Sequence, residues 1–395
     1  MKGKILTVAR PPSDPEIDQE DQIESEDTSR EESELKPWDP MEIRITTKSF
    51  TVREIFIQIE QGEIDLAPDF QRDFVWDVKQ QTRLIESILL GIPLPAFYFN
   101  QDDLGQYQVI DGVQRLTTIK QFMSGKLLLE GKYLEYLSPA NGNTYETLDN
   151  ATRRRFASTQ IVAHVIEPQT PSAVKYDIFN RVNTGGSPLS PQELRHCMGK
   201  HESRTFLKSL VELRSFDEAT SFSFWRKGDD GVRERFNRRM VDREMALRFC
   251  AFRHFTPKEY SAAGSLDAYL LNFTRRIDSV DELVRLGISL PTLKTEFDTA
   301  MINCHEVFGD MAFRVKQKTG KRGPINRALF EAQALAFADH RPDKIKKCKD
   351  ELNLRFLELL LDDDFSASVR SGTGALRNVE MRLNKARALV DMVVR

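Results

Sequence analysis

Residues 107–124 read YQVIDGVQRLTTIKQFMS, and this stretch decides the fold of the first half of the chain. Its opening segment, Tyr107 to Ile110, is short and apolar and follows a turn-rich segment, as in the second strand of a hairpin. From Val113 onward the apolar residues recur at helical spacing, and Gly125 ends the pattern. The stretch therefore predicts a strand that passes directly into a helix, with Asp111-Gly112 at the junction.

This junction has the composition of a phosphate-binding turn. A helix N-terminus offers unpaired backbone N–H groups and the positive end of the helix dipole, and Gly112 allows an oxygen to approach the backbone. Arg115 can hold two phosphate oxygens, Asp111 can hold a hydrated cation or an attacking water, and Gln114 adds a neutral donor and acceptor. The alternative is an ordinary turn in which Asp111 caps the helix and Arg115 pairs with a nearby carboxylate.

Helix-capping patterns and apolar periodicity also predict the neighbouring helices and strands. Three helix starts carry capping boxes, each a capping side chain followed three residues later by Glu or Gln. We expect helices from Thr51 with Glu54, from Asp77 with Gln80, at residues 113–124, at 172–182 and from Ser190 with Glu193, and strands near 43–45, 96–99, 107–110 and 161–166.

Two further segments are candidates for the same site. In residues 68–76, Gln71 and Arg72 stand between aromatic residues that would hold them rigidly, although the segment also reads as plain core with an incidental surface Arg. In residues 179–186 a helix ends among Asn180, Arg181, Asn183 and Gly185, where side chains and backbone could close over a ligand. The simpler interpretation is that Gly185 is only the left-handed helix cap.

The second half of the chain is predicted to be helical. Apolar periodicity of the helical kind dominates from about residue 200, with segments near 203–213, 238–255, 265–277, 293–308, 325–338, 342–361 and 375–394. We therefore expect an α+β protein with three parts: a disordered acidic tail over residues 1–40, a mixed domain over 41–200 and an all-α helical domain over 201–395.

The acidic tail, from residue 11 to about residue 36, is nearly devoid of apolar residues and cannot bury enough surface to fold alone. It is interpreted as a solvating tail, or as a docking segment that imitates nucleic acid and competes for a basic groove. The formal net charge of −3 shows no general basic character, so any nucleic-acid surface must be local. Candidates for that surface are the Arg-rich run containing Arg233, Arg235, Arg238 and Arg239, which also fits a salt-bridged surface, and residues 366–377.

The four cysteines are Cys197, Cys250, Cys304 and Cys348, and none lies in a close pair of the kind that zinc sites need. We expect reduced, mostly buried thiols. No apolar run approaches the length of a membrane span, and no secretory cleavage site follows the N-terminus, so a cytoplasmic location is expected.

Taken together, the three segments resemble the N-terminal domain of the GmrSD type IV restriction endonucleases, of the ParB/sulfiredoxin-like superfamily. The resemblance rests on Phe70-Gln71-Arg72 with Trp76, on Leu84 to Ser87 before Gly91-Ile92-Pro93, on Asp111 to Thr118, and on Phe179 to Gly186 with Leu189 and Glu193. It covers roughly residues 45–200, and more loosely the helical half, including Pro324 to Glu331.

The resemblance implies nucleoside triphosphate binding, with hydrolysis and Mg²⁺ as further expectations, in an anti-phage or restriction-type defence system that senses DNA. Implied nucleotide contacts are Gln71, Arg72, Gly112, Gln114, Arg115, Asn180, Arg181, Asn183 and Gly185, with Asp111 and Arg115 catalytic and Asp111 at the metal. The family's motif usually reads Asp-Gly-Gln-Gln-Arg, and Val113 replaces its first Gln here. Turnover is therefore expected to be slower or absent.

Larger family members often carry a C-terminal His-Asn-His nuclease unit, which needs paired histidines near an Asn. The six histidines of this chain are scattered, so self-contained nuclease activity is not expected. Three hypotheses follow: a nucleotide-dependent defence protein, with DNA and a separate nuclease or ATPase as partners; a non-catalytic DNA-binding or adaptor module that recruits a nuclease; and direct DNA cleavage by this chain.

Overall fold

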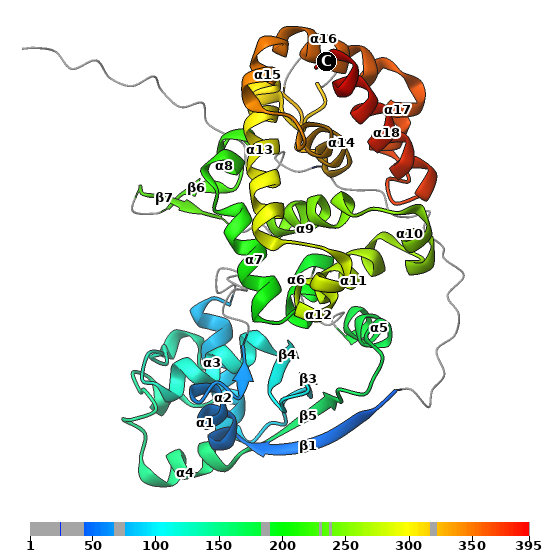
Figure 1. The fold of residues 1–395 in the computed structure, drawn as a ribbon. Helices are drawn as coiled ribbons and strands as arrows, with labels where there is room; N and C mark the ends of the chain where they lie inside the picture. The colour runs from blue at the N-terminus through cyan, green and yellow to red at the C-terminus, as the bar shows by residue number, and fades with distance from the viewer. Residues whose placement is uncertain are drawn as a thin grey trace, which may run out of the picture.

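The computed structural model describes residues 24, 43–66, 76–182, 190–228, 231–236, 239–316 and 322–394. A mixed sheet with its helices forms one end of the molecule, and a helical region forms the other (Figure 1). The predicted α+β class, with a mixed first part and a helical second part, is confirmed. The expected disordered tail over residues 1–40 lies outside the described residues, with the exception of Glu24.

The sheet has five strands in the order β1-β5-β3-β4-β2. Neighbours β1 and β5, and β3 and β4, run antiparallel, whereas β3 and β5, and β2 and β4, run parallel. The predicted pairing of the strands on either side of the turn-rich segment 100–105 is confirmed as the β3-β4 pair. The strands are β1 (Ile45–Thr51), β2 (Ile64–Asp65), β3 (Phe97–Gln101), β4 (Tyr107–Asp111) and β5 (Gln160–Ile166).

Helices cover one face of this sheet, where they share a single hydrophobic core with it (Figure 1). The predicted capping boxes of Thr51 with Glu54 and of Asp77 with Gln80 are both formed, since each first turn leaves backbone donors that need a partner. The helices on this face are α1 (Val52–Glu60), α2 (Val78–Leu90), α3 (Val113–Met123) and α4 (Asn150–Ser158), the last of which was not predicted.

The opposite face is covered by α5 (Ser172–Val182) and α6 (Pro191–Met198). Successive strand residues point to opposite faces, so Val109 joins the first core while Ile110 joins a second cluster. That cluster consists of Ile110, Ile166, Phe179, Leu194 and Cys197. The capping box predicted for Ser190 and Glu193 begins α6.

The second half packs around one large core whose first member along the chain is Phe206. Most predicted helices are present, but the segment near 342–361 is divided at Cys348 and short helices follow several others. The helices are α7 (His201–Val211), α8 (Arg214–Ala219), α9 (Val241–Arg253), α10 (Pro257–Ala263), α11 (Leu266–Ile277), α12 (Val280–Leu286), α13 (Leu290–Phe308), α14 (Arg327–Phe337), α15 (Pro342–Lys347), α16 (Lys349–Leu361), α17 (Asp363–Arg370) and α18 (Leu376–Val393).

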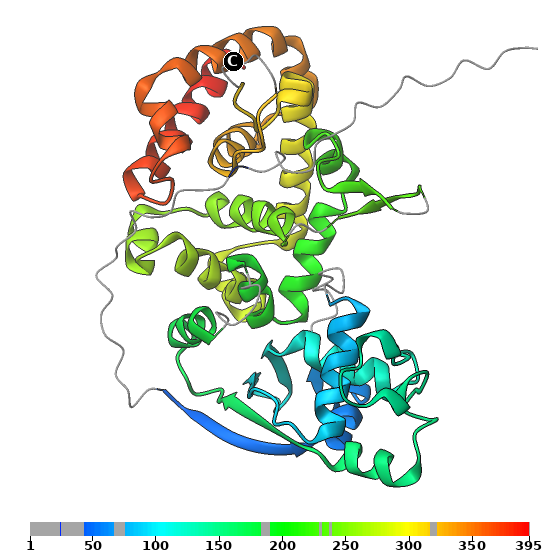
Figure 2. The same ribbon diagram turned by 180° about the vertical axis from the view of Figure 1, so that it is seen from behind.

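This half is not entirely helical, which corrects the all-α expectation. Strands β6 (Trp225–Lys227) and β7 (Arg233–Arg235) form an antiparallel hairpin that projects from the helices (Figure 2). Charged residues dominate both strands, so they lack the apolar alternation by which a half-buried strand is recognised.

Helix α6 and the start of α7 connect the two halves. Arg204 on α7 pairs with Asp65 at the end of β2, 2.7 Å apart, and also donates to the carbonyl of His196. All four cysteines are free, and three are buried, as expected. Among the described residues, no helix is both long and apolar enough to cross a membrane.

Candidate functional site

The turn between β4 and α3 is built on a glycine. Gly112 is the N-cap of α3 in the left-handed conformation, with φ 99°, and it provides no side-chain cap. A Cβ at this position would lie 2.3 Å from Cδ1 of the fully buried Phe97 ring. The turn therefore needs glycine twice, for its backbone angle and for its space, and it leaves the first amides of α3 without a side-chain cap from the N-cap residue.

Gln114, in the first turn of α3, carries an orphaned acceptor. Its Oε1 is buried and accepts no hydrogen bond from any described residue. A buried polar atom without a partner destabilises a fold by about 1–3 kcal/mol, so such atoms are normally satisfied by water, an ion or a ligand. The first turn of α3 thus has no side-chain cap from Gly112 and carries one buried oxygen without a described partner.

The structure places Arg115 against its own turn. One guanidinium nitrogen donates to the carbonyl of Pro95, and the other lies 2.8 Å from Asp111 Oδ2 and 3.4 Å from the carbonyl of Ala96. The group also stacks on Phe97, 4.2 Å from the ring centre. In this arrangement Arg115 holds the start of β3 to the end of β4.

Burial lowers the pKa of Arg115, an effect that the Asp111 carboxylate opposes. The side chain of Arg115 is 12% exposed and that of Asp111 is 35% exposed, so the carboxylate remains the more accessible partner. Of the interpretations open from the sequence, the ion pair between Arg115 and a carboxylate is formed, while the N-cap is Gly112 rather than Asp111. A phosphate clamp by Arg115 would require its guanidinium to exchange Asp111 or a carbonyl for the phosphate.

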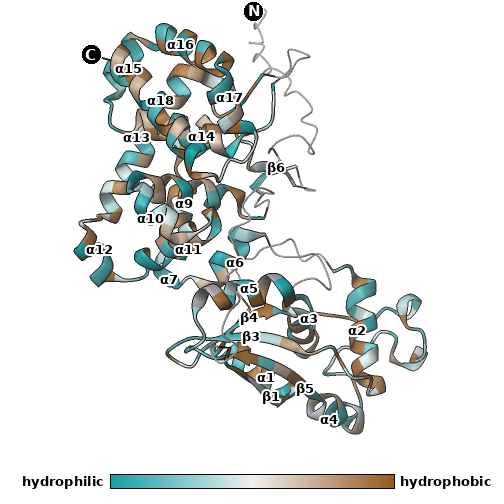
Figure 3. Cartoon of the chain, turned by 90° about the vertical axis from the view of Figure 1, so that its right-hand side faces the viewer, coloured by the Kyte–Doolittle hydropathy of each residue, from teal (hydrophilic) through white to brown (hydrophobic). Residues whose placement is uncertain are grey.

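Helices α5 and α6 approach the same end of β4. Ile110, directly before Asp111, packs with Phe179 of α5 and Leu194 of α6, and α5 lies over the β3-β4 side of the sheet (Figure 3). Arg181 lies exposed in the last turn of α5. The structure thus brings α5 close to the Gly112 turn, whereas the side chain of Asn180 and all of Asn183 and Gly185 lie outside what it describes.

Gln71 and Arg72 fall within residues 67–75, which are also outside the described residues. The strand before them, β2, runs parallel to β4, with Asp65 opposite Gln108. The carboxyl ends of the two strands therefore lie at the same edge of the sheet, where the Gly112 turn also lies.

The basic run of the second half is largely engaged in ion pairs. Arg235 lies beside Asp217 and Asp242, and Arg239 lies 3.7 Å from the buried Glu193. Arg233 is exposed on β7, and Arg238 is outside the described residues. Two of the four candidate nucleic-acid residues are therefore tied to carboxylates at the base of the hairpin.

A metal site made only of protein groups is not found among the residues that the structure describes, where no three His, Cys, Asp or Glu side chains gather. Asp111 is a single carboxylate, already paired with Arg115. This donor set suits Mg²⁺ only if phosphate oxygens and water provide the other ligands, which is the usual arrangement for nucleotide-bound Mg²⁺.

Phe97 is the part of this site that the sequence did not single out. Its ring supports Arg115 and excludes a Cβ at Gly112. It lies within the predicted strand near 96–99, so alternation of faces indicated only that it was a core candidate. The β3-β4 pairing next to it also has a register irregularity, between Tyr98 and Phe99, that no local pattern predicts.

Residues 52–198 match the family described as "GmrSD restriction endonuclease, N-terminal domain". The predicted resemblance is thereby confirmed for this part of the chain. One solved structure, "Structure of the C2221 form of Pnob8-like ParB-N domain", aligns with 89% of this chain and 99% of its own at 12% identity and a TM-score of 0.21. A TM-score this low does not establish a shared arrangement of elements. No curated protein matches the sequence.

Proposed function

We propose, from the GmrSD restriction endonuclease N-terminal domain that residues 52–198 form, that this chain binds a nucleoside triphosphate in a restriction-type defence system acting on DNA. The observation that carries the proposal is the start of α3, where Gly112 leaves the backbone amides without a side-chain cap at the positive end of the helix. The phosphates bind these amides, and α5, which packs beside Ile110, closes the other side of the site.

Gln114 completes the grip on the nucleotide. Its buried Oε1 needs a donor or a cation, and a ribose hydroxyl, a water molecule or Mg²⁺ supplies one. Arg115 keeps Asp111 in place and offsets its charge, so that the phosphates do not face an unpaired carboxylate. Mg²⁺, when bound, neutralises phosphate charge, with Asp111 as its protein ligand.

Hydrolysis is the further step of this proposal. A water oxygen bonds to the terminal phosphorus while the bridging P–O bond breaks, and the products are a nucleoside diphosphate and phosphate. Asp111, partly exposed beside the turn, orients that water and accepts its proton. Val113 occupies a position where a polar side chain could help to orient the attacking water, so we expect slow turnover.

The binding test uses two nearly isosteric variants of the full chain, Val113→Asp and Val113→Asn. A carboxylate in the first turn interacts favourably with the helix dipole, so it should not disrupt α3. Its negative charge nevertheless repels phosphate. We expect Val113→Asp to weaken binding of labelled triphosphates at least about tenfold relative to Val113→Asn. Equal binding by the two variants would overturn the site.

Turnover is tested separately with Asp111→Asn and Val113→Gln, each assayed with Mg²⁺ and with or without DNA. We expect Asp111→Asn to bind triphosphate but lose hydrolysis, and Val113→Gln to hydrolyse about ten times faster than the natural chain through better positioning of water. Hydrolysis that survives in Asp111→Asn would remove Asp111 from the mechanism.

A second candidate function is a non-catalytic DNA-binding or adaptor module that recruits a nuclease, and the projecting β6-β7 hairpin with exposed Arg233 favours it (Figure 2). DNA binding that persists in about 0.3 M salt, without triphosphate binding, would select this function. Metal-dependent nicking of plasmid DNA would instead indicate direct cleavage by the chain.

A further inference from the structure

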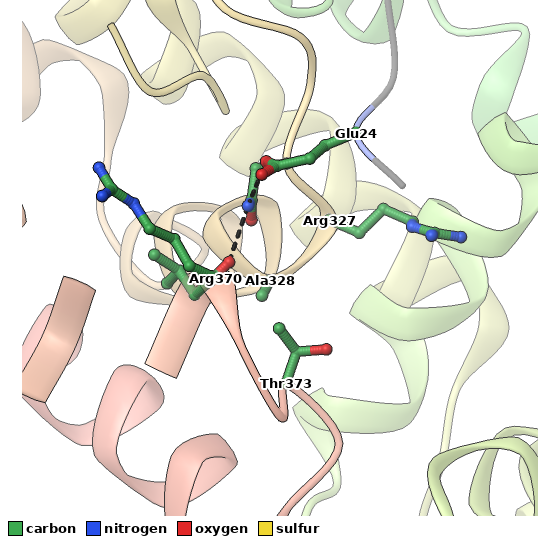
Figure 4. A pocket seen from close by; sticks show the side chains of 7 residues that line it. Glu24, Arg327, Ala328, Arg370 and Thr373 are labelled. Atoms are coloured by element: carbon green, nitrogen blue, oxygen red, sulfur yellow. Dashed lines mark hydrogen bonds between the residues drawn. The ribbon is translucent and has the colours of Figure 1, made fainter. Parts of the chain in front are cut away.

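A small pocket lies in the helical half, far from α3 along the chain. It forms where the N-terminus of α14 meets the end of α17 and the turn that follows (Figure 4). Its lining joins the segment Pro324 to Glu331 to the Ser-, Gly- and Arg-rich segment 366–377, and it includes one residue from the acidic N-terminal stretch. The lining residues are Glu24, Asn326, Arg327, Ala328, Val369, Arg370 and Thr373.

Glu24 forms part of the wall of this pocket and is held there by two hydrogen bonds. Its backbone N–H donates to the carbonyl of Ile325 at 2.9 Å, and its carboxylate Oε2 accepts from Asn326 Nδ2 at 2.7 Å. A backbone bond and a side-chain bond from the same residue fix both its position and its direction. The contact joins residues that are 302 positions apart in the chain.

Asn326 is held so that it presents this amide. Its side chain is 5% exposed, its Oδ1 accepts from the N–H of Leu329 as the N-cap of α14, and its Nδ2 also donates to the carbonyl of Val369 at 2.7 Å. These bonds fix the orientation of the Asn326 amide. Its second N–H therefore points to the position of the Glu24 carboxylate, where it can donate to an acceptor.

The surroundings favour an anion. The carboxylate lies at the N-terminus of an 11-residue helix, where the dipole attracts negative charge. Arg327 and Arg370 lie on opposite sides of the contact (Figure 4). Arg370 is exposed, and Arg327 is partly buried beside Glu244.

The sequences on the two sides of the contact are complementary in charge. Glu24 belongs to a stretch with acidic side chains at 14, 16, 18, 20, 21, 26, 27, 31, 32 and 34. The stretch of sequence before the pocket is basic, with Lys316, Lys318, Lys321 and Arg322. Opposite charge over an extended segment favours docking of one on the other beyond the single contact at Glu24.

We infer that this pocket is the docking site of the acidic N-terminal segment, anchored by Glu24, and that the docked segment excludes nucleic-acid phosphates from the same surface. The Glu24 carboxylate takes the place that a phosphate oxygen would take on Asn326, because both are anionic acceptors for an N–H donor. The tail and a polyanion therefore compete for Asn326, Arg370 and the start of α14. This inference does not depend on nucleotide binding at Gly112.

Docking is tested by hydrogen exchange on full-length variants Glu24→Lys and Glu26→Lys, which change the net charge equally. The Glu24 amide is bonded to Ile325, so it exchanges slowly in the natural chain. We expect Glu24→Lys to speed exchange at this position about tenfold or more and Glu26→Lys to leave it nearly unchanged. Asn326→Asp keeps an N-cap acceptor for α14 but removes the donor, and it should behave like Glu24→Lys. Equal exchange in the two Lys variants would overturn docking at Glu24.

Exclusion of phosphate is tested with a labelled 20-base-pair DNA at about 0.1 M salt. We expect Glu24→Lys to bind this DNA about three to ten times more tightly than Glu26→Lys, and the gain to disappear when Asn326→Asp is added. Rapid exchange in Glu24→Lys without tighter DNA binding would overturn the exclusion of phosphate.

Discussion

At the residue scale, Gly112 occupies a position that no other residue fits without displacing the Phe97 ring. The positive φ alone disfavours a side chain, and the 2.3 Å approach to Phe97 adds a clash with a fully buried ring. The same close packing brings the Arg115 guanidinium onto that ring. Backbone angle, ring packing and the Asp111 ion pair therefore depend on one another.

Gly112→Ala should lower the free energy of unfolding by about 2–4 kcal/mol, as the sum of backbone strain and overpacking. Gly142→Ala is the matched control, because Gly142 also has a positive φ, of 76°, but a Cβ there would meet nothing within 4 Å. We expect the control to lose about 1 kcal/mol in urea denaturation. Equal losses in the two variants would show that the clash with Phe97 is relieved by movement.

At the element scale, a chain of buried ion pairs connects the helices of the second half to α6. Arg382 of α18 bonds Glu331 of α14, and Glu331 bonds Arg248 of α9 at 2.8 Å. Glu244 of α9 then joins Arg248, at 2.8 Å, to Arg195 of α6, at 3.1 Å. Arg327, at the Glu24 pocket, also contacts Glu244. Buried ion pairs thus hold four helices in fixed positions relative to one another.

Removing the last member of this ion-pair network should lower the free energy of unfolding. Arg382→Met removes a fully buried partner of Glu331 and should destabilise the protein by about 3–5 kcal/mol, because the carboxylate is left with fewer donors in a dry site. Arg285→Met removes an exposed pair with Glu282 and should lower stability by less than about 1 kcal/mol. Thermal unfolding of both variants checks the contrast, and a loss below 1 kcal/mol for Arg382→Met would contradict it.

At the scale of the whole molecule, α6 lies between the two cores and carries a histidine that resists protonation. His196 is 3% exposed, and Arg243 lies 3.3 Å from its Nδ1. Burial, followed by the charges of Arg204 and Arg243, lowers the pKa of His196 from 6.5 to about 2. The unfolded chain therefore binds a proton below about pH 6.5 that the folded chain does not, so stability falls as the pH drops through that range.

Between pH 7 and pH 5 this single group should remove about 2 kcal/mol of stability. His196→Gln keeps an acceptor for Arg243 and removes the titration, so its urea midpoint should depend less on pH than that of the natural chain. The two are compared at pH 7, 6 and 5. If the urea midpoints of the two proteins change with pH in parallel, a group other than His196 controls the loss of stability in acid.

Much of the first half could be predicted because its signals are local. The capping boxes of Thr51, Asp77 and Ser190, the hairpin before Tyr107 and the strand-to-helix junction at Gly112 each depend on residues a few positions apart. The resemblance to the GmrSD-type domain was carried instead by its motifs, such as Asp111 to Thr118, and the match over residues 52–198 confirms it. Local backbone chemistry is enough for such elements.

Other features depend on partners distant in the chain, and only the tertiary structure decided them. Arg115 pairs within its own turn but rests on a ring from β3, the two-residue β2 exists only through its pairing with β4, and Glu24 meets Asn326 across 302 positions. The sequence alone determined that a strand passes directly into a helix at Asp111-Gly112. Folding determined which way the Arg115 guanidinium points, because burial and long-range packing, which no local pattern encodes, direct it inward onto Phe97.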